Sequence, residues 1–198
     1  MPPKNFSTFT DNQNTQVDDN IMSSVFTHAA LPIALYTVFP RNRISSSVVI
    51  VGSICSVAPD LDVVGFSFGI KYGEMLGHRG ITHSISFAAV VAILVTILMR
   101  SSGKRNRLIT FLFLFISTIS HGILDSMTNG GLGVAFFAPF NNARYFFRWR
   151  PIQVSPIGMD FFSADGVWVI FSELKWIWCP SAVVITIVCL WKCRPDPR

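Results

Sequence analysis

The chain has 198 residues, of which 51% are hydrophobic and 14% are charged, with a formal net charge of +5. A soluble domain carries closer to a quarter charged residues. The apolar residues also come in long runs, so the composition excludes an ordinary soluble domain and predicts an all-α polytopic membrane helix bundle. The positive charge lies mostly in short loops beside those runs, so we expect a lipid bilayer and no nucleic acid as partner.

The chain begins with a polar stretch, residues 1–20, that is rich in Asn, Asp and Thr. It lacks helical periodicity, and it lacks the basic and apolar regions of a cleavable signal peptide. We therefore predict a disordered tail over 1–20. Residues 21–194 are expected to form a single membrane-embedded helical domain.

Five apolar segments follow the tail, at about 22–39, 44–58, 81–99, 108–127 and 174–191. We predict about five membrane segments from them, although the second is short for a span of about 20 residues. A Gly-rich stretch, 63–80, separates the second from the third. A mixed region, 128–172, precedes the last segment and has too many Gly, Pro and charged residues to be a span itself.

Basic residues predict the orientation of these segments. Three clusters fall on one side of the membrane if all five segments span: Arg41 and Arg43; Arg100, Lys104, Arg105 and Arg107; and Lys192, Arg194 and Arg198. The positive-inside rule makes that side the cytoplasm, with the N-terminus outside and the C-terminus inside. A contrary signal comes from three arginines that would lie outside: Arg144, Arg148 and Arg150.

The same topology gathers the ionisable groups of the apolar segments near the outer face. They are all four histidines of the chain and three aspartates: His28, Asp60, Asp62, His78, His83, His121 and Asp125. Ionisable groups at membrane depth are candidates for a functional site. Imidazole and carboxylate are ligands that suit zinc and similar divalent metals. The sequence therefore predicts a site for one or two divalent ions, with zinc as the expected metal.

Spacing supports two of these groupings. His121 and Asp125 are four residues apart on a helical segment, so they share one helix face. That spacing suits a shared ligand and equally suits a structural hydrogen bond. His78 and His83 are five apart and converge only if His78 lies in the loop before the helix and His83 in its first turn. Flanking glycines make such a break plausible.

Asp60 and Asp62 belong to the string PDLD, in which Pro59 is expected to end the preceding helix. In an extended chain the two carboxylates would face opposite ways. One could then bind metal while the other holds a ligand in place or acts as a general base. Taken alone, an Asp at a helix boundary is more often structural. His28, taken alone, is better explained by packing or by a hydrogen bond than by metal ligation.

Arg79 lies between two of the histidines, where a guanidinium has no apolar environment. We expect it either to hold an anionic group of a substrate or to pair with Glu74. The basic and aromatic stretch 144–150 is open to two interpretations: it could hold a lipid headgroup or cover the site, or it could be an interfacial anchor.

Four ordered strings, PDLD, GHRGITHS, SHGILDSMTNGG and PFNNARYFFRWRPIQVSP, resemble the YdjM-like family of bacterial membrane-bound proteins. That family is described as metal-dependent hydrolases and as LexA-binding, inner membrane-associated proteins. The resemblance covers about residues 22–192. One departure is Phe147–Arg148–Trp149–Arg150, where members often have FPWRP. The resemblance implies a location in the bacterial inner membrane, and it implies that the four histidines and three aspartates are the metal ligands.

These expectations combine into a hydrolase that uses a metal-bound water at the outer membrane-facing surface. Asp60 or Asp62 would be the general base or a bridging ligand, and Arg79 would stabilise developing negative charge. The location suggests an amphiphilic, phospholipid-like substrate or another phosphoester. The alternative is a non-enzymatic protein, either a metal or proton transporter or a membrane-tethered interaction protein. A transporter should place its ionisable groups near the bilayer midplane rather than near one face.

Overall fold

The computed structural model describes residues 21–22, 25–40, 42–100, 103–156 and 164–192. Within these ranges the regular secondary structure is helical, apart from two isolated β-bridges and one two-residue antiparallel pairing of β1 (Ile21–Met22) with β2 (Ser155–Pro156). The α-helices are α1 (Val25–Val38), α2 (Ser46–Val57), α3 (Ile85–Leu98), α4 (Lys104–Ser126), α5 (Ala164–Glu173) and α6 (Cys179–Lys192). The tail predicted for residues 1–20 lies outside the described residues.

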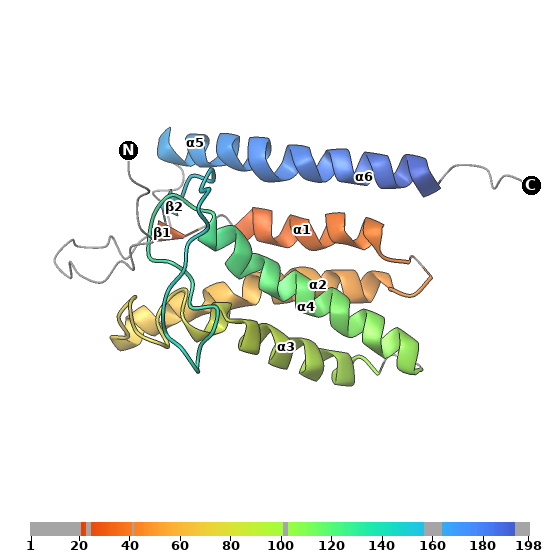
Figure 1. Ribbon diagram of the computed structural model, residues 1–198, viewed down its shortest axis with the longest axis horizontal. Coiled ribbons are helices and arrows are strands. Elements are labelled where there is room, and N and C mark those ends of the chain that lie inside the picture. Colours follow the sequence, from red (N-terminus) through yellow and green to blue (C-terminus); the bar gives the residue numbers. More distant parts are fainter. Residues whose placement is uncertain (1–20, 23–24, 41, 101–102, 157–163, 193–198) are drawn as a thin grey trace, which may run out of the picture.

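Helix α4 is the centre of the bundle and contacts α1, α2 and α3. Its Phe113 and Leu114 are fully buried, and they pack with residues of α2 and α3 such as Val48 and Ala92. Gly52 of α2 permits this approach, because a Cβ atom there would lie 2.6 Å from the ring of Phe113. Figure 1 shows α3 on one flank of the bundle and the α5–α6 helix on the other, along α1.

Two 3-10 helices precede α3. Helix η1 (Ala58–Phe68) continues directly from α2, and η2 (Ile81–His83) leads into α3. Helix α2 ends at Val57, as expected from a proline at position 59, but PDLD is not extended, because it is wound into η1. A proline in the first turn lacks only an N–H that has little use there, so the chain passes into a 3-10 helix instead of stopping.

The last helical segment begins earlier than the sequence predicts. Helix α5, the π-helical turn η4 (Leu174–Trp178) and α6 follow one another without a break, so helix starts at Ala164 rather than near residue 174. Glu173, the last residue of α5, has a buried carboxylate that accepts a 2.7 Å hydrogen bond from Thr27 Oγ1 of α1. A partner on a neighbouring helix thus makes the acid tolerable.

Three helical stretches in the described residues are long and apolar enough to cross a membrane: Ser46–Phe68, Asn106–Ser126 and Gly166–Lys192. Helix α3 is apolar but has only 14 residues. Helix α1 also has 14 residues and contains Pro32. The helical membrane character agrees with the sequence prediction. By the length and composition of the described helices, three spans are found rather than the predicted five or so.

One end of the bundle carries an irregular cap made of the segment between α4 and β2 and of the turns between η1 and η2 (Figure 1). Arg144 joins these parts. Its guanidinium donates to the carbonyl oxygens of Tyr72 (2.9 Å), Glu74 (3.1 Å), His78 (3.0 Å) and Gly133 (3.2 Å). Both Nη atoms of Arg144 therefore donate to carbonyl oxygens inside the protein. Of the arginines in 144–150, Arg148 and Arg150 remain as candidates to bind a lipid headgroup.

Candidate metal centre

All seven predicted ligand residues meet at the capped end of the bundle. They come from α1 (His28), η1 (Asp60 and Asp62), the turns before η2 (His78), η2 itself (His83) and α4 (His121 and Asp125). The four histidines are at most 2% exposed, Asp125 is fully buried, and Asp60 is 6% exposed. Histidines and carboxylates gathered at this depth are costly unless they pair with one another or hold a cation.

The structure places His78 in a turn before the helix, as its spacing from His83 requires. His83 ends η2 and lies before α3 rather than in its first turn. Gly77 and Gly80 allow this path, because a Cβ at either position would come within 2.2 Å of a backbone carbonyl oxygen. The two imidazole rings stand edge to face with centroids 5.2 Å apart.

Three histidines have their Nδ1 atoms occupied by neighbours outside the centre. His78 Nδ1 lies 2.7 Å from Asp62 Oδ1, and His83 Nδ1 lies 3.3 Å from Asp62 Oδ2. His121 Nδ1 lies 2.7 Å from the carbonyl oxygen of Ser56, to which it can only donate. Partners of this kind fix the orientation and tautomer of a metal-binding histidine and raise its basicity. Asp62 thus supports two ligands.

The free Nε2 atoms of His83 and His121 face two carboxylates. The two nitrogens are 3.0 Å apart; His83 Nε2 lies 3.8 Å from Asp60 Oδ1 and 3.1 Å from Asp125 Oδ2, while His121 Nε2 lies 3.1 Å and 3.6 Å from the same two oxygens. A tetrahedral zinc site with bonds of about 2.0–2.1 Å has ligand atoms about 3.3 Å apart. The spacing and the donor set therefore fit a divalent ion.

A second group of ligands shares Asp125 with the first. His28 Nε2 lies 3.6 Å from Asp125 Oδ1, and the rings of His28 and His121 stack with centroids 3.8 Å apart. The combination of Asp60, His78, His83 and Asp125 and the combination of His28, His121 and Asp125 each place one ligand atom per residue within 4.8 Å of the others. A carboxylate between two such groups is the arrangement found between paired metal ions.

Several buried polar atoms of this cluster have no hydrogen-bond partner among the described residues: both ring nitrogens of His28, Nε2 of His78 and Oδ2 of Asp60. Buried polar atoms left unpaired are rare and call for an explanation, which a bound ion would supply. These observations, together with the donor chemistry, show that the residues present could hold a metal ion.

Arg79 is fully buried beside the centre and pairs with Asp125 rather than with Glu74. Its Nε lies 3.3 Å from Asp125 Oδ2, and its Nη1 donates to the carbonyl oxygens of Gly130 (3.1 Å) and Leu132 (2.9 Å). Its backbone has a φ of 60°, a left-handed conformation that non-glycine residues seldom adopt. Arg79 therefore fixes Asp125 and the loop after α4 in one arrangement.

The carboxylates also set the protonation of His83. Burial lowers the pKa of His83, but its hydrogen bonds with Asp125, Asp60 and Asp62 outweigh that effect and raise the pKa well above its ordinary value. The charged form of an imidazole is favoured by opposite charges close to it. In the metal-free protein His83 thus holds a proton that a cation would have to displace.

Three supporting residues escaped the sequence interpretation. Ser56 accepts from His121 through its backbone carbonyl and donates through its hydroxyl to the carbonyl oxygen of His28 at 2.8 Å, and no sequence pattern reveals either contact. Thr82 Oγ1 bridges Asp62 Oδ2 (2.5 Å) and His83 Nδ1 (3.0 Å), and its position inside GITHS could have been noticed. Gly122 lets α4 approach η2, because a Cβ there would lie 2.8 Å from the carbonyl oxygen of His83.

Comparisons with known proteins identify the family of the chain. Inner membrane protein YbcI of Escherichia coli (strain K12) is 38% identical over 165 residues, which cover 83% of this chain and 95% of that protein. No solved structure matches the chain. The family model of the YdjM inner membrane protein matches residues 22–194. That match includes every helix and the whole histidine–aspartate cluster, and the chain belongs to the YdjM inner membrane protein family.

Proposed function

We propose that the protein is a membrane-bound, metal-dependent hydrolase that acts on a phosphoester or lipid-like substrate. The observation that carries the proposal is the spacing of the inward-facing atoms: Nε2 of His83 and His121, with Oδ1 of Asp60 and Oδ2 of Asp125, at 3.0–3.8 Å in five of their pairs. Two Nε2 atoms at hydrogen-bond distance cannot both carry a proton, so at least one of them has a lone pair. A salt bridge that serves structure alone would not need such a pair of nitrogens.

A divalent ion bound here, zinc being the expected one, would lower the pKa of a water molecule and polarise the group under attack. The chain itself does the rest. Asp62 and the Ser56 carbonyl keep the imidazoles oriented. Asp60 is the general base of this proposal, because its buried oxygen Oδ2 has no hydrogen-bond partner among the described residues.

Arg79 supports the site by charge. Its guanidinium touches Asp125 and compensates part of the negative charge that three aspartates bring into a buried space. Its Nη2 has no hydrogen-bond partner among the described residues and is the donor that remains for an anionic group of a substrate. Both uses agree with a reaction in which negative charge develops on oxygen.

The proposal places the centre at the outer face of the inner membrane, with a lipid-like substrate reaching it from the bilayer. Support for this location is the charge distribution, because the loops at the opposite ends of the helices carry the clusters of lysine and arginine. The ligand residues all lie at the other end, near helix termini rather than midway along the apolar helices.

The test is the metal content of protein purified in mild detergent, measured by elemental mass spectrometry. We expect one or two divalent ions per chain in the wild type, with loss in His83→Ala and Asp125→Ala. The matched control is Glu74→Gln, which alters an exposed carboxylate of the same cap. A metal-free wild type, even after metal is supplied during growth, would contradict the proposal and leave a polar network. Retained metal justifies a screen of phosphoester and lipid substrates.

A further inference from the structure

The α5–η4–α6 helix lies against the bundle with an apolar cavity between them. The cavity has a volume of about 360 Å³, which falls in the range of ligand sites. Its walls come from three helices: Leu31, Pro32, Ala34, Leu35 and Val38 of α1; Ile116, Ser120 and Leu124 of α4; and Trp176, Ile177, Pro180, Ser181 and Val184 of η4 and α6. We call this space the groove.

The groove is elongated along the helices. Each helix lines it with residues about one turn apart, such as Leu31, Leu35 and Val38 on α1, so the groove follows the helix axes for about two turns, or roughly 11 Å. Two of its three walls belong to stretches that are long and apolar enough to cross a membrane. A narrow apolar space parallel to membrane helices matches an extended hydrocarbon chain.

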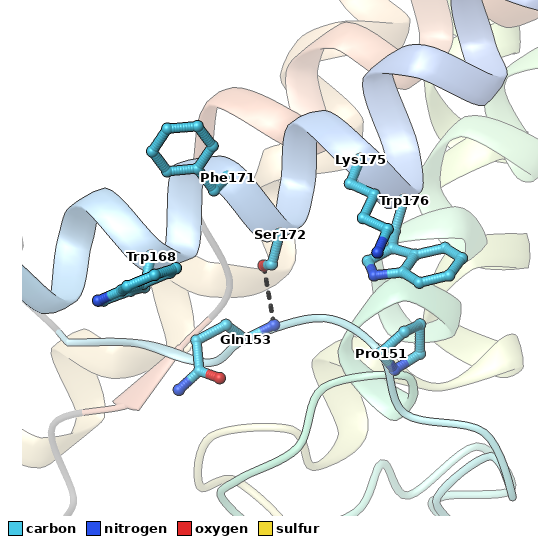
Figure 2. A pocket seen from close by; sticks show the side chains of 7 residues that line it. All are labelled: Pro151, Gln153, Trp168, Phe171, Ser172, Lys175 and Trp176. Atoms are coloured by element: carbon cyan, nitrogen blue, oxygen red, sulfur yellow. Dashed lines mark hydrogen bonds between the residues drawn. The ribbon is translucent and has the colours of Figure 1, made fainter.

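A second, more polar pocket adjoins the groove. It has a volume of about 400 Å³ and is lined by Pro151, Gln153, Trp168, Phe171, Ser172, Lys175 and Trp176 (Figure 2). Trp176 lines both spaces. The Lys175 ammonium lies 4.9 Å from the centroid of the Trp176 ring, so the cation stands where the apolar groove meets the polar pocket.

Hydrogen bonds fix the depth of this junction. Thr27 Oγ1 donates to Glu173 and accepts from Trp178 Nε1 at 3.2 Å, which brings the η4 turn level with the first turn of α1. His28 follows Thr27 directly, so Lys175 lies at about the depth of the metal ligands, near one face of the bundle. Tryptophan and lysine at such a level are typical of the headgroup region.

We propose that the groove and the adjoining pocket form a binding site for one anionic phospholipid. One acyl chain lies in the groove between α1, α4 and α6, and the phosphate lies beside Lys175. A π-helical turn at this position widens the helix backbone locally, as such turns often do at functional sites. The site does not depend on the metal centre, and it is tested without reference to metal.

The test is native mass spectrometry of the full chain released from micelles that contain phosphatidylglycerol or phosphatidylcholine. We expect retention of one phosphatidylglycerol by the wild type. Val184→Trp fills the groove and should reduce retention about tenfold. Val183→Trp is the matched control, because Val183 is an exposed valine on the same helix outside the groove. Lys175→Gln should weaken phosphatidylglycerol about fivefold and leave phosphatidylcholine unchanged, with Lys71→Gln as its control.

A second measurement needs no variant. Phosphatidylglycerol with a photoreactive acyl chain should crosslink to groove residues such as Leu31, Ser181 and Val184 of the wild-type protein, and peptide mass spectrometry locates the adducts. Equal lipid retention in the two tryptophan variants, or adducts spread evenly over the outer surfaces of α3 and α6, would identify the bound lipid as ordinary surrounding bilayer lipid and overturn the proposal. A dimer that excludes lipid from the groove would overturn it as well.

Discussion

Asp62 shows how a residue can matter to the centre without facing it. Each of its oxygens meets a different imidazole, Oδ1 with His78 and Oδ2 with His83, and Thr82 donates to Oδ2 as well. The carboxylate therefore orients two histidines at once and makes both better electron donors.

Replacement of Asp62 by Asn should separate this supporting role from ligation. The side chain keeps its shape, but it loses its charge and one of its two acceptor oxygens, so we expect zinc affinity to fall about 10- to 100-fold without complete loss. Competition with a chelator of known affinity measures the change. Asp125→Asn provides the contrast, since loss of a direct ligand should abolish stoichiometric binding. Equal effects of the two substitutions would contradict the assignment.

Zinc binding should also depend on pH. The aspartates hold the pKa of His83 well above its ordinary value in the metal-free protein, so below that raised pKa a proton occupies the nitrogen that the metal needs. Affinity should thus increase with pH through the neutral range, by about tenfold per pH unit if one proton is displaced. Isothermal titration in buffers of different ionisation enthalpy counts the protons released. A release of no protons would argue that His83 is not a ligand.

At the scale of elements, the centre depends on how closely η2 lies against α4. Gly122 follows His121 on α4 and has no Cβ atom. The carbonyl oxygen of His83 in η2 lies close to the place where such a Cβ would be. The two helices bring His83 Nε2 and His121 Nε2 to 3.0 Å only because no side chain intervenes.

Gly122→Ala should therefore disturb both packing and metal binding. The new Cβ would lie 2.8 Å from the His83 carbonyl oxygen, and relief of such a contact typically costs about 1–3 kcal/mol of unfolding free energy. Thermal unfolding in detergent and zinc titration report the two effects. Gly73→Ala is the control, because a Cβ there meets its nearest atom at 3.8 Å. Unchanged zinc affinity in Gly122→Ala would show that the η2–α4 distance is not critical.

At the scale of the whole molecule, the predicted topology awaits its own measurement. The sequence places the C-terminus in the cytoplasm and the metal centre outside. A green fluorescent protein fused after residue 198 should fluoresce, and an alkaline phosphatase fused at the same point should be inactive. The reverse result would place the centre at the cytoplasmic face. The same two reporters placed before residue 21 locate the N-terminus. Termini on opposite sides of the membrane mean an odd number of spans, and termini on the same side mean an even number.

Much of the site was predictable because its chemistry is unusual for its surroundings. Every histidine of the chain lies in or beside an apolar segment, and the helical spacing of His121 and Asp125 needs no tertiary information. The tertiary partners were not predictable in this way. Arg79 was expected either to hold an anionic group of a substrate or to pair with Glu74. Its guanidinium pairs with Asp125 rather than with Glu74, because only the folded cap brings the loop after α4 over it.

The fold was predicted in outline and missed at its irregular points. The continuation of α2 into η1 depends on a proline that fits the first 3-10 turn, and the early start of α5 depends on a hydroxyl from another helix next to Glu173. In the first case a proline is tolerated because of its place in the turn, and in the second a buried acid is tolerated because of a partner that the sequence does not reveal.

Pro59 has one consequence that reaches from backbone to chemistry. Ser56 lies in the last turn of α2, where carbonyl oxygens lack part of their intrahelical donors, and Pro59 just beyond it has no hydrogen to give. That oxygen accepts from His121 Nδ1 instead, at 2.7 Å. The contact fixes the orientation of the imidazole, so that its Nε2 points toward Asp60 and His83. The end of one helix thus sets the direction of a ring on another.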